Sequence, residues 1–349
     1  MRLPGDRLPS ARTNDVPSLR RTRSNLSNVL SIERLGPIHT MVSAIPSCNG
    51  VVEKPAVNLR AHRMCWRQEA PMNAKTNTAQ IRVVKRSPAY WRVTIDNPPL
   101  NVMGPPMVVE CHDLIAALEA DEQVRVVVFD SAVEGFFLNH SDFMAKFEDL
   151  TSLPAGPTGL PQWPDFLVRL TRAPVVSIAL IRGRATGNGS EITLACDMSF
   201  ASREKTKISQ WEVGVGLVAG GGPMARLPHL IGRNRALEVL LSSEDLSGDQ
   251  AAEYGYVNRA LPDAELDAFV EALATRIAGF DKWAIANTKR LVNTSLPPDV
   301  EFGAGWDACM ASITRPAAQE SFKALMALGF HKPGDVEDRL GHYIGQLAR

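Results

Sequence analysis

The chain has 349 residues, of which 45% are hydrophobic and 22% are charged, and its formal net charge at neutral pH is zero. These values are typical of a globular protein with one large core or two smaller ones. They give no sign of a nucleic-acid partner, and no apolar run reaches the roughly 18 residues that a membrane span needs. We therefore expect neither nucleic acid nor membrane among its partners.

Five cysteines are scattered along the chain, and none of them has the CxxC or Cys/His spacing of a zinc site. An odd number of dispersed cysteines is typical of a protein from a reducing compartment. We therefore expect a cytoplasmic protein without a structural metal. The cysteines are Cys48, Cys65, Cys111, Cys196 and Cys309.

Residues 1–71 carry ten Arg and one Lys against five Asp or Glu. Since the whole chain has a net charge of zero, the remainder has a net negative charge of the same size. This segment is rich in Pro, Ser and Asn and has no sustained periodicity, so we expect a disordered N-terminal extension over residues 1–78. Three interpretations remain open: an organelle transit peptide, a partner-binding arm, or sequence upstream of a true start at Met72.

The folded part is expected to begin near residue 79. The stretch "IRVVKRSPAYWRVTIDNPP" predicts two β-rich segments around Ser87-Pro88. "GPPMVVECHDLIAALEADEQ" has helical spacing with two prolines at its entry. "VRVVVFDSA" is a continuous apolar run of strand length, which is typical of a strand buried on both faces.

The same pattern repeats after a Pro- and Gly-rich interval at 152–164. A strand is predicted in "RAPVVSIALIRGRA", a helix in "SEITLACDM" and strand-like structure in "SFASREKTKIS". Strands that alternate with helices indicate an α/β protein with a largely parallel sheet covered on both faces. From about Pro223 onward the pattern is mostly helical.

Two loops follow apolar strands, where open parallel sheets collect their ligands: "FFLNHSDF" and "GRATGNGSE". In the second loop, Gly187 and Gly189 permit unusual backbone angles and a close approach to the main chain. The N–H of Asn188 opens a helix, whose free donors attract an anion. Simple turn packing remains the alternative for the glycines, and a surface carboxylate remains the alternative for Glu191.

A second glutamate, Glu212, follows a strand and precedes the glycine cluster Gly220, Gly221 and Gly222. A solvated loop carboxylate is the alternative for Glu212 alone. Two glutamates that each lie beside a glycine-rich turn fit a paired acid/base site.

Three blocks in this order resemble the enoyl-CoA hydratase/isomerase family, the crotonase superfamily, over about residues 80–330. They are "IDNPPLNVMGPPMVVECHDLIAALEADEQVRVVVFDSAVEGFFLNHSDF", "APVVSIALIRGRATGNGSEITLACDMSFAS" and "KISQWEVGVGLVAGGGPMARLPHLIGRNRALEVLLSSEDLSGDQAAEYGYVNRAL". The resemblance implies the crotonase (ClpP-like) fold of repeated ββα units. It also implies a core with a CoA-thioester site over 79–275 and a helical trimerisation region over 276–349.

Carried over position by position, the resemblance implies an oxyanion hole made of the backbone N–H groups of Ser141 and Asn188. These donors would stabilise the thioester oxygen in an enolate-like intermediate. It also implies two catalytic carboxylates, Glu191 and Glu212. One acts on water at C3 and the other exchanges the proton at C2. The remaining expected substrate-binding positions are His140, Asp142, Gly187 and Trp211.

Three positions depart from the family pattern. His140 and Asn188 stand where glycine is usual, and Trp211 stands where proline is common. Because the hole uses main-chain donors, neither His140 nor Asn188 abolishes it, and Asn tolerates left-handed backbone angles better than most residues. His140 either contacts substrate or has a packing or solvent-exposed role. Trp211 either narrows the acyl pocket or packs in the core.

The sequence therefore predicts an enzyme that reversibly adds water to a 2-enoyl-CoA. One alternative is a Δ3,Δ2-enoyl-CoA isomerase that uses Glu212 alone. The other is a non-catalytic homologue that binds acyl-CoA or a macromolecule. The resemblance implies a homotrimer or hexamer and no cofactor, since coenzyme A is part of the substrate.

Overall fold

The computed structural model describes residues 79–347, so the expected extension over 1–78 lies outside the described residues. Within the described range, six strands form one sheet in the order β1-β2-β3-β5-β7-β10. β1 pairs antiparallel with β2 and the remaining pairs are parallel, which confirms the two predicted β segments around Ser87-Pro88 and the largely parallel sheet. The strands are β1 Ile81–Ser87, β2 Tyr90–Ile95, β3 Val126–Ser131, β5 Val176–Ile181, β7 Met198–Ser202 and β10 Arg259–Leu261.

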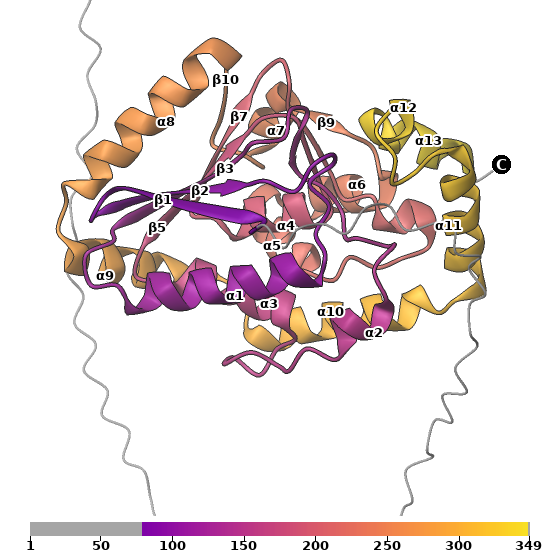
Figure 1. Ribbon diagram of the computed structural model, residues 1–349, viewed down its shortest axis with the longest axis horizontal. Coiled ribbons are helices and arrows are strands. Elements are labelled where there is room, and N and C mark those ends of the chain that lie inside the picture. Colours follow the sequence, from indigo (N-terminus) through magenta and orange to yellow (C-terminus); the bar gives the residue numbers. More distant parts are fainter. Residues whose placement is uncertain (1–78, 348–349) are drawn as a thin grey trace, which may run out of the picture. The chain divides into compact units, whose positions relative to one another are not determined.

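Helices cover both faces of this sheet, as Figure 1 shows for α1 (Pro105–Ala120) on one side and α8 (Asp263–Ala278) on the other. Alternate side chains of β3 point to opposite faces of the sheet and pack against these two helices. Val127 and Phe129 belong to the larger core with α1, whereas Val126 and Val128 pack with α8. The continuous apolar run of β3 therefore reflects a strand buried on both faces, as predicted.

A second sheet holds four short strands in the order β4-β6-β8-β9, and the sequence did not predict it as a separate sheet. The expected strand in "SFASREKTKIS" is two strands, β7 and β8, which belong to different sheets. The charged turn at 203–205 separates them, because its exposed side chains keep that segment at the surface. The strands are β4 Phe136–Leu138, β6 Arg184–Thr186, β8 Lys207–Ser209 and β9 Leu246–Ser247.

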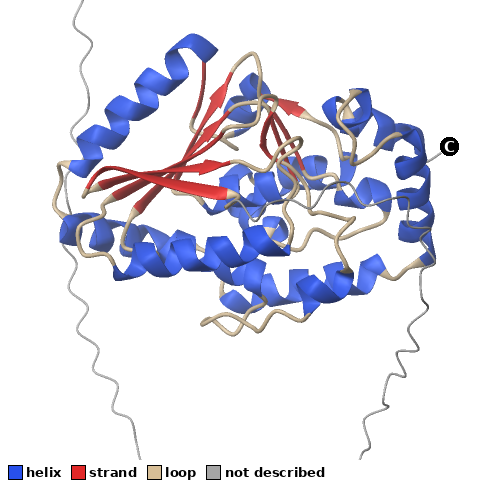
Figure 2. Ribbon diagram, viewed as in Figure 1, coloured by secondary structure: helices blue, strands red, loops and turns tan. Residues whose placement is uncertain are grey.

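The chain after Pro223 is mostly helical, as expected (Figure 2). The expected boundary at 275/276 lies inside α8, so a helix joins the two expected regions. No helix within residues 79–347 is long and apolar enough to cross a membrane. The remaining helices are α2 Phe147–Thr151, α3 Gln162–Arg172, α4 Asn188–Ala195, η1 Glu212–Val215, α5 Pro223–Ile231, α6 Arg233–Ser242, α7 Gly248–Tyr254, α9 Lys282–Val292, η2 Asn293–Ser295, α10 Asp299–Ile313, α11 Pro316–Leu328, α12 Asp335–Asp338 and α13 Leu340–Leu347.

The last helices pack onto η1, the short helix that begins at Glu212. Trp211, Val215 and Leu217 form one apolar cluster with buried side chains of α11 to α13, among them Leu325 and Leu340. The C-terminal region therefore contributes to the core next to the second predicted glutamate.

Candidate active site

The two glycine- and polar-rich loops lie side by side because β4 and β6, which precede them, are parallel neighbours in the small sheet. Ser141 follows β4, and Asn188 is the first residue of α4 after β6. The hydroxyl of Ser141 donates to Oδ1 of Asn188 at 2.8 Å. The structure thus brings together the two residues whose N–H groups were expected to act together.

Backbone hydrogen bonds on both sides of Ser141 fix the position of its N–H group. Met103 N donates to the carbonyl of His140 at 3.0 Å, and Asp142 N donates to the carbonyl of Met103 at 2.8 Å. Among the described residues, none accepts a hydrogen bond from the N–H of Ser141 or of Asn188. The N–H of Asn188 is not used within α4, because the first hydrogen bond of this helix runs from Glu191 N to Gly187 O.

Two positions of the second loop require glycine for different structural reasons. Gly187 has φ +55°, and a Cβ there would lie 2.9 Å from Nε1 of Trp211 and 3.0 Å from Oε1 of Glu212. A Cβ at Gly189 would lie 1.8 Å from the carbonyl oxygen of Leu138. Gly187 is therefore required by its backbone conformation, and Gly189 by the close packing of α4 against β4.

Glu191 lies in the first turn of α4 with 3% of its surface exposed. Its carboxylate accepts hydrogen bonds from Trp163 Nε1 at 2.6 Å, from Gly221 N at 2.5 Å and from Asn188 Nδ2 at 3.3 Å. Burial raises the pKa of Glu191, while these donors and the charge of Arg226 lower it. The carboxylate is therefore buried but well solvated by protein donors.

Glu212 begins η1 after β8, and it is 9% exposed. Its Oε2 has no hydrogen-bond partner among the described residues. Burial, together with the nearby charge of Glu191, raises the pKa of Glu212 to about 8. Because two adjacent buried carboxylates do not ionise together at low cost, the pair holds one proton near neutral pH, and the poorer donor set of Glu212 places it there.

His140, which was expected to bind substrate, is 1% exposed. Its Nδ1 lies 2.8 Å from the carbonyl oxygen of Ser141 and its Nε2 lies 3.2 Å from a carboxylate oxygen of Glu337. Its ring packs against Trp211 and Phe330. In this structure, His140 and the equally buried Trp211 contact protein rather than solvent.

Asp142 differs from these two residues, because 32% of its side chain is exposed. Its Oδ1 accepts a hydrogen bond from Met144 N at 3.0 Å. Asp142 is therefore the expected substrate-binding side chain that faces solvent in this structure.

The sequence did not assign four residues that hold the site together. Trp163 and Gly221 bind the Glu191 carboxylate, Arg226 acts on it through its charge, and Glu337 binds His140. The glycine cluster was a visible signal for Gly221, whereas nothing in the sequence marks Glu337. Among the described residues, no group of three or more His, Cys, Asp or Glu could hold a metal ion.

The chain is similar to known proteins over this region. Residues 86–324 match the family model described as enoyl-CoA hydratase/isomerase. A mouse protein named enoyl-CoA hydratase domain-containing protein 2, mitochondrial, is 32% identical over 208 residues, which cover 57% of this chain and 69% of the mouse protein. The crotonyl-CoA hydratase of Syntrophomonas wolfei is 28% identical over 58% of this chain and 76% of its own length.

A solved structure gives the same result. The crystal structure of a candidate enoyl-CoA hydratase from Streptomyces avermitilis superposes with a TM-score of 0.73 at 37% identity. The match covers 79% of this chain and 99% of that one. The expected crotonase fold is therefore confirmed.

Proposed function

Because the chain belongs to the enoyl-CoA hydratase/isomerase family, we propose that it catalyses the reversible addition of water to the double bond of a 2-enoyl-CoA. One observation carries this proposal. Two buried carboxylates, one bound by three donors and one with an unpartnered oxygen, lie on elements adjoining two free backbone N–H groups. This is an acid/base pair next to a pair of oxyanion donors.

The thioester carbonyl oxygen accepts hydrogen bonds from the N–H groups of Ser141 and Asn188. As water attacks C3, negative charge moves onto this oxygen, and the two donors stabilise the resulting enolate. One such donor lowers the barrier by about 2.7 to 4 kcal/mol. The N-terminal end of α4 adds its positive dipole at the same place.

The two glutamates move the protons in this mechanism. Glu191, whose carboxylate is bound by three donors, takes a proton from the water that forms the new C3–O bond. Glu212 is protonated at neutral pH, because of its raised pKa, and gives its proton to C2 of the enolate. Water is added across the double bond, and one proton must pass from Glu191 to Glu212, through solvent, before the next turnover. Coenzyme A enters only as part of the substrate.

Absorbance of the conjugated enoyl thioester tests the proposal. The full chain is mixed with crotonyl-CoA, whose absorbance falls on hydration, and with 3-butenoyl-CoA, whose absorbance rises on isomerisation. We expect rapid loss with crotonyl-CoA and a decrease of about 100-fold or more in Glu191→Gln and in Glu212→Gln. The exposed Glu320→Gln serves as the matched control with unchanged activity.

The other outcomes distinguish the alternatives. An isomerase that uses Glu212 alone would raise the absorbance with 3-butenoyl-CoA and leave the absorbance of crotonyl-CoA unchanged. The Glu191→Gln variant would keep this isomerase activity. No change with either substrate, from a folded protein that binds acyl-CoA, would assign a non-catalytic binding protein.

We further propose a homotrimer, or a pair of trimers, in which the C-terminal helices contact neighbouring subunits. Large apolar side chains on α9 and at the start of α10 support this proposal, since Trp283, Val292 and Val300 are 66% to 74% exposed in the single chain. Sedimentation velocity measures the subunit number.

A cytoplasmic location also stays a proposal, which cell fractionation tests. The mouse relative is named as mitochondrial.

A further inference from the structure

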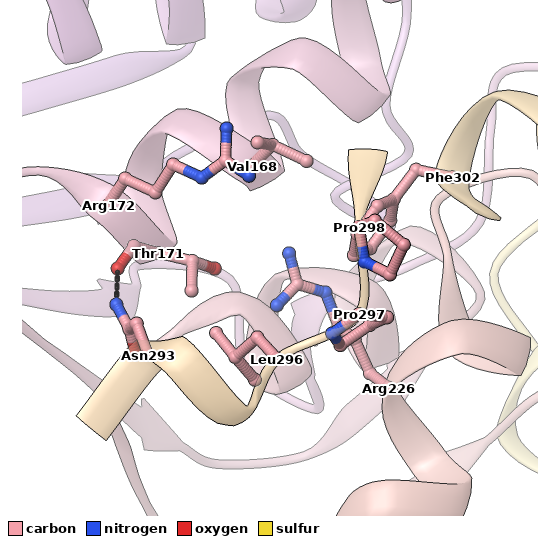
Figure 3. A pocket seen from close by; sticks show the side chains of 9 residues that line it. All are labelled: Val168, Thr171, Arg172, Arg226, Asn293, Leu296, Pro297, Pro298 and Phe302. Carbon is pink, nitrogen blue, oxygen red and sulfur yellow. Dashed lines mark hydrogen bonds between the residues drawn. The ribbon is translucent and has the colours of Figure 1, made fainter. Parts of the chain in front are cut away.

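A cavity of about 150 Å³, which neither of the two glutamates lines, lies between α3, α5 and the segment that leads into α10. Arg172 of α3 and Arg226 of α5 contribute its charged groups, and Val168, Leu296, Pro298 and Phe302 contribute apolar walls. Figure 3 shows the guanidinium of Arg226 reaching into the space between α3 and the segment with Leu296. The cavity has room for several water molecules or one small organic ion.

Arg226 is a buried cation with few hydrogen-bond partners among residues 79–347. Its side chain is 5% exposed, and its one hydrogen bond among the described residues runs from Nη2 to the carbonyl oxygen of Leu167 at 3.3 Å. Its Nε is buried and has no partner there, although a guanidinium carries five N–H donors. The carboxylates of Glu191 and Asp197 act on Arg226 through their charge, but neither of them accepts a hydrogen bond from its guanidinium within the described residues. Since most of its N–H donors are without a partner there, the guanidinium of Arg226 can bind a further acceptor.

A second guanidinium lines the same cavity, but it already has an anionic partner. Arg172 is bound through both of its terminal nitrogens to the carboxylate of Asp299. Burial and the positive charge of Arg172 lower the pKa of Arg226 to about 10, against the charges of Glu191 and Asp197, which raise it. The guanidinium whose donors remain available at the cavity is therefore that of Arg226.

We propose that this cavity binds a small oxyanion through Arg226, which holds either the carboxylate of a short aliphatic acid or inorganic phosphate. The oxyanion accepts from the terminal N–H groups of Arg226 that reach into the cavity, next to the ion pair of Arg172 and Asp299. The apolar walls, including the Phe302 ring 4.8 Å from the guanidinium carbon, favour an alkyl chain on the ligand.

The site is linked to Glu191 by charge. The positive charge of Arg226 lowers the pKa of Glu191, so an anion bound to Arg226 raises that pKa. This consequence rests on the proposed function, in which Glu191 acts as the base. An anion in the cavity would then move the acidic limb of the rate profile to higher pH.

Isothermal titration of the full chain with sodium butyrate and with sodium phosphate tests the proposal, with sodium chloride at equal ionic strength as the reference. We expect saturable one-to-one binding of at least one oxyanion. Binding should weaken by about tenfold or more in Arg226→Gln, which removes the charge, and in Leu296→Trp, which fills the cavity. Leu291→Trp, on an exposed position of α9 that does not line the cavity, is the matched control with unchanged binding.

The elution volume and the far-UV spectrum of each variant establish that it is folded, and Leu296→Trp decides the test if Arg226→Gln fails to fold. Stronger butyrate binding assigns the carboxylate, and phosphate binding alone assigns the inorganic ion. Either result supports the site. No saturable binding beyond the chloride reference, or equal binding by Leu296→Trp, would overturn it, whether or not the chain is a hydratase. If the protein catalyses hydration, a saturating ligand should move the acidic limb of the pH–rate profile to higher pH in the wild-type protein. It should leave the profile of Leu296→Trp in place.

Discussion

The carboxylate of Glu337 lies 3.2 Å from Nε2 of His140, although 197 positions separate the two residues in the chain. Nδ1 of the same ring lies 2.8 Å from the carbonyl oxygen of Ser141. The His140 ring thus bridges the Glu337 carboxylate of the C-terminal region and the backbone that follows β4. Because this ring also fixes the carbonyl of Ser141, the C-terminal region helps to set the backbone of a proposed oxyanion donor.

Glu337→Gln should lower the free energy of unfolding by about 3 kcal/mol, because it replaces a fully buried carboxylate that accepts hydrogen bonds from Asn139 Nδ2 and His331 N and lies 3.2 Å from Nε2 of His140. Urea denaturation at neutral pH measures this change. Glu320→Gln on α11 is the exposed control, which we expect to lie within about 0.5 kcal/mol of the wild-type protein. Equal stability of the two variants would mean that the buried carboxylate of Glu337 does not stabilise the fold.

The same pair predicts a pH dependence. Burial alone would raise the pKa of Glu337, but the hydrogen bonds from His140, Asn139 and the N–H of His331, with the charge of His140, hold it at about 2. A depressed carboxyl pKa stabilises the fold above the ordinary value of 4.5 and loses that effect as the pH falls toward 2. The stability difference between wild type and Glu337→Gln should therefore shrink over this range. A constant difference would exclude the titration of Glu337.

Gly189→Ala should lower the free energy of unfolding by about 3 kcal/mol, because its Cβ would lie 1.8 Å from the carbonyl oxygen of Leu138. The matched control is Gly345→Ala in α13, where nothing lies within 4 Å of the added Cβ. That variant should be unchanged or more stable by about 0.4 to 1 kcal/mol. Thermal unfolding of both variants gives the comparison, and equal midpoints would mean that α4 and β4 can separate freely.

Trp163→Phe removes the hydrogen bond to the Glu191 carboxylate and keeps an aromatic ring in the core. A hydrogen bond to the charged form lowers a carboxyl pKa, so its loss should raise the pKa of Glu191 further. We expect the acidic limb of kcat/KM for hydration to move up by about one pH unit. Trp283→Phe, at a position that is 74% exposed, should leave the profile in place. A limb that moves equally in both variants would mean that Trp163 does not act on Glu191.

The sequence predicted the long elements well because their apolar patterns are local. The run around Val127 and the helical spacing that follows Pro105 each have one favourable secondary structure. The three-residue strands β4, β6 and β8 were not separated into their own sheet, because so short a segment has too few residues to show a period. The charged turn after Ser202 was consequently taken as part of one strand.

The site was predictable only where its residues lie in a local motif. Gly187, Asn188 and Glu191 share one turn, and their spacing drew attention to them. The steric reason for Gly189, its contact with β4, depends on a partner about fifty positions earlier and was not visible. Glu337 and Arg226 act through tertiary contacts alone, so no pattern along the chain marks their roles.

Exchange of the hydrogens at C2 of butyryl-CoA with D2O tests the central claim most directly, which is that Glu212 handles the C2 proton while Glu191 acts on water. The full chain is incubated with this saturated thioester above the pKa of about 8 of Glu212, and NMR follows the C2 signal. We predict exchange in the wild-type protein and in Glu191→Gln, and a loss of about 100-fold or more in Glu212→Gln. Exchange that survives in Glu212→Gln and is lost in Glu191→Gln would contradict the assigned roles.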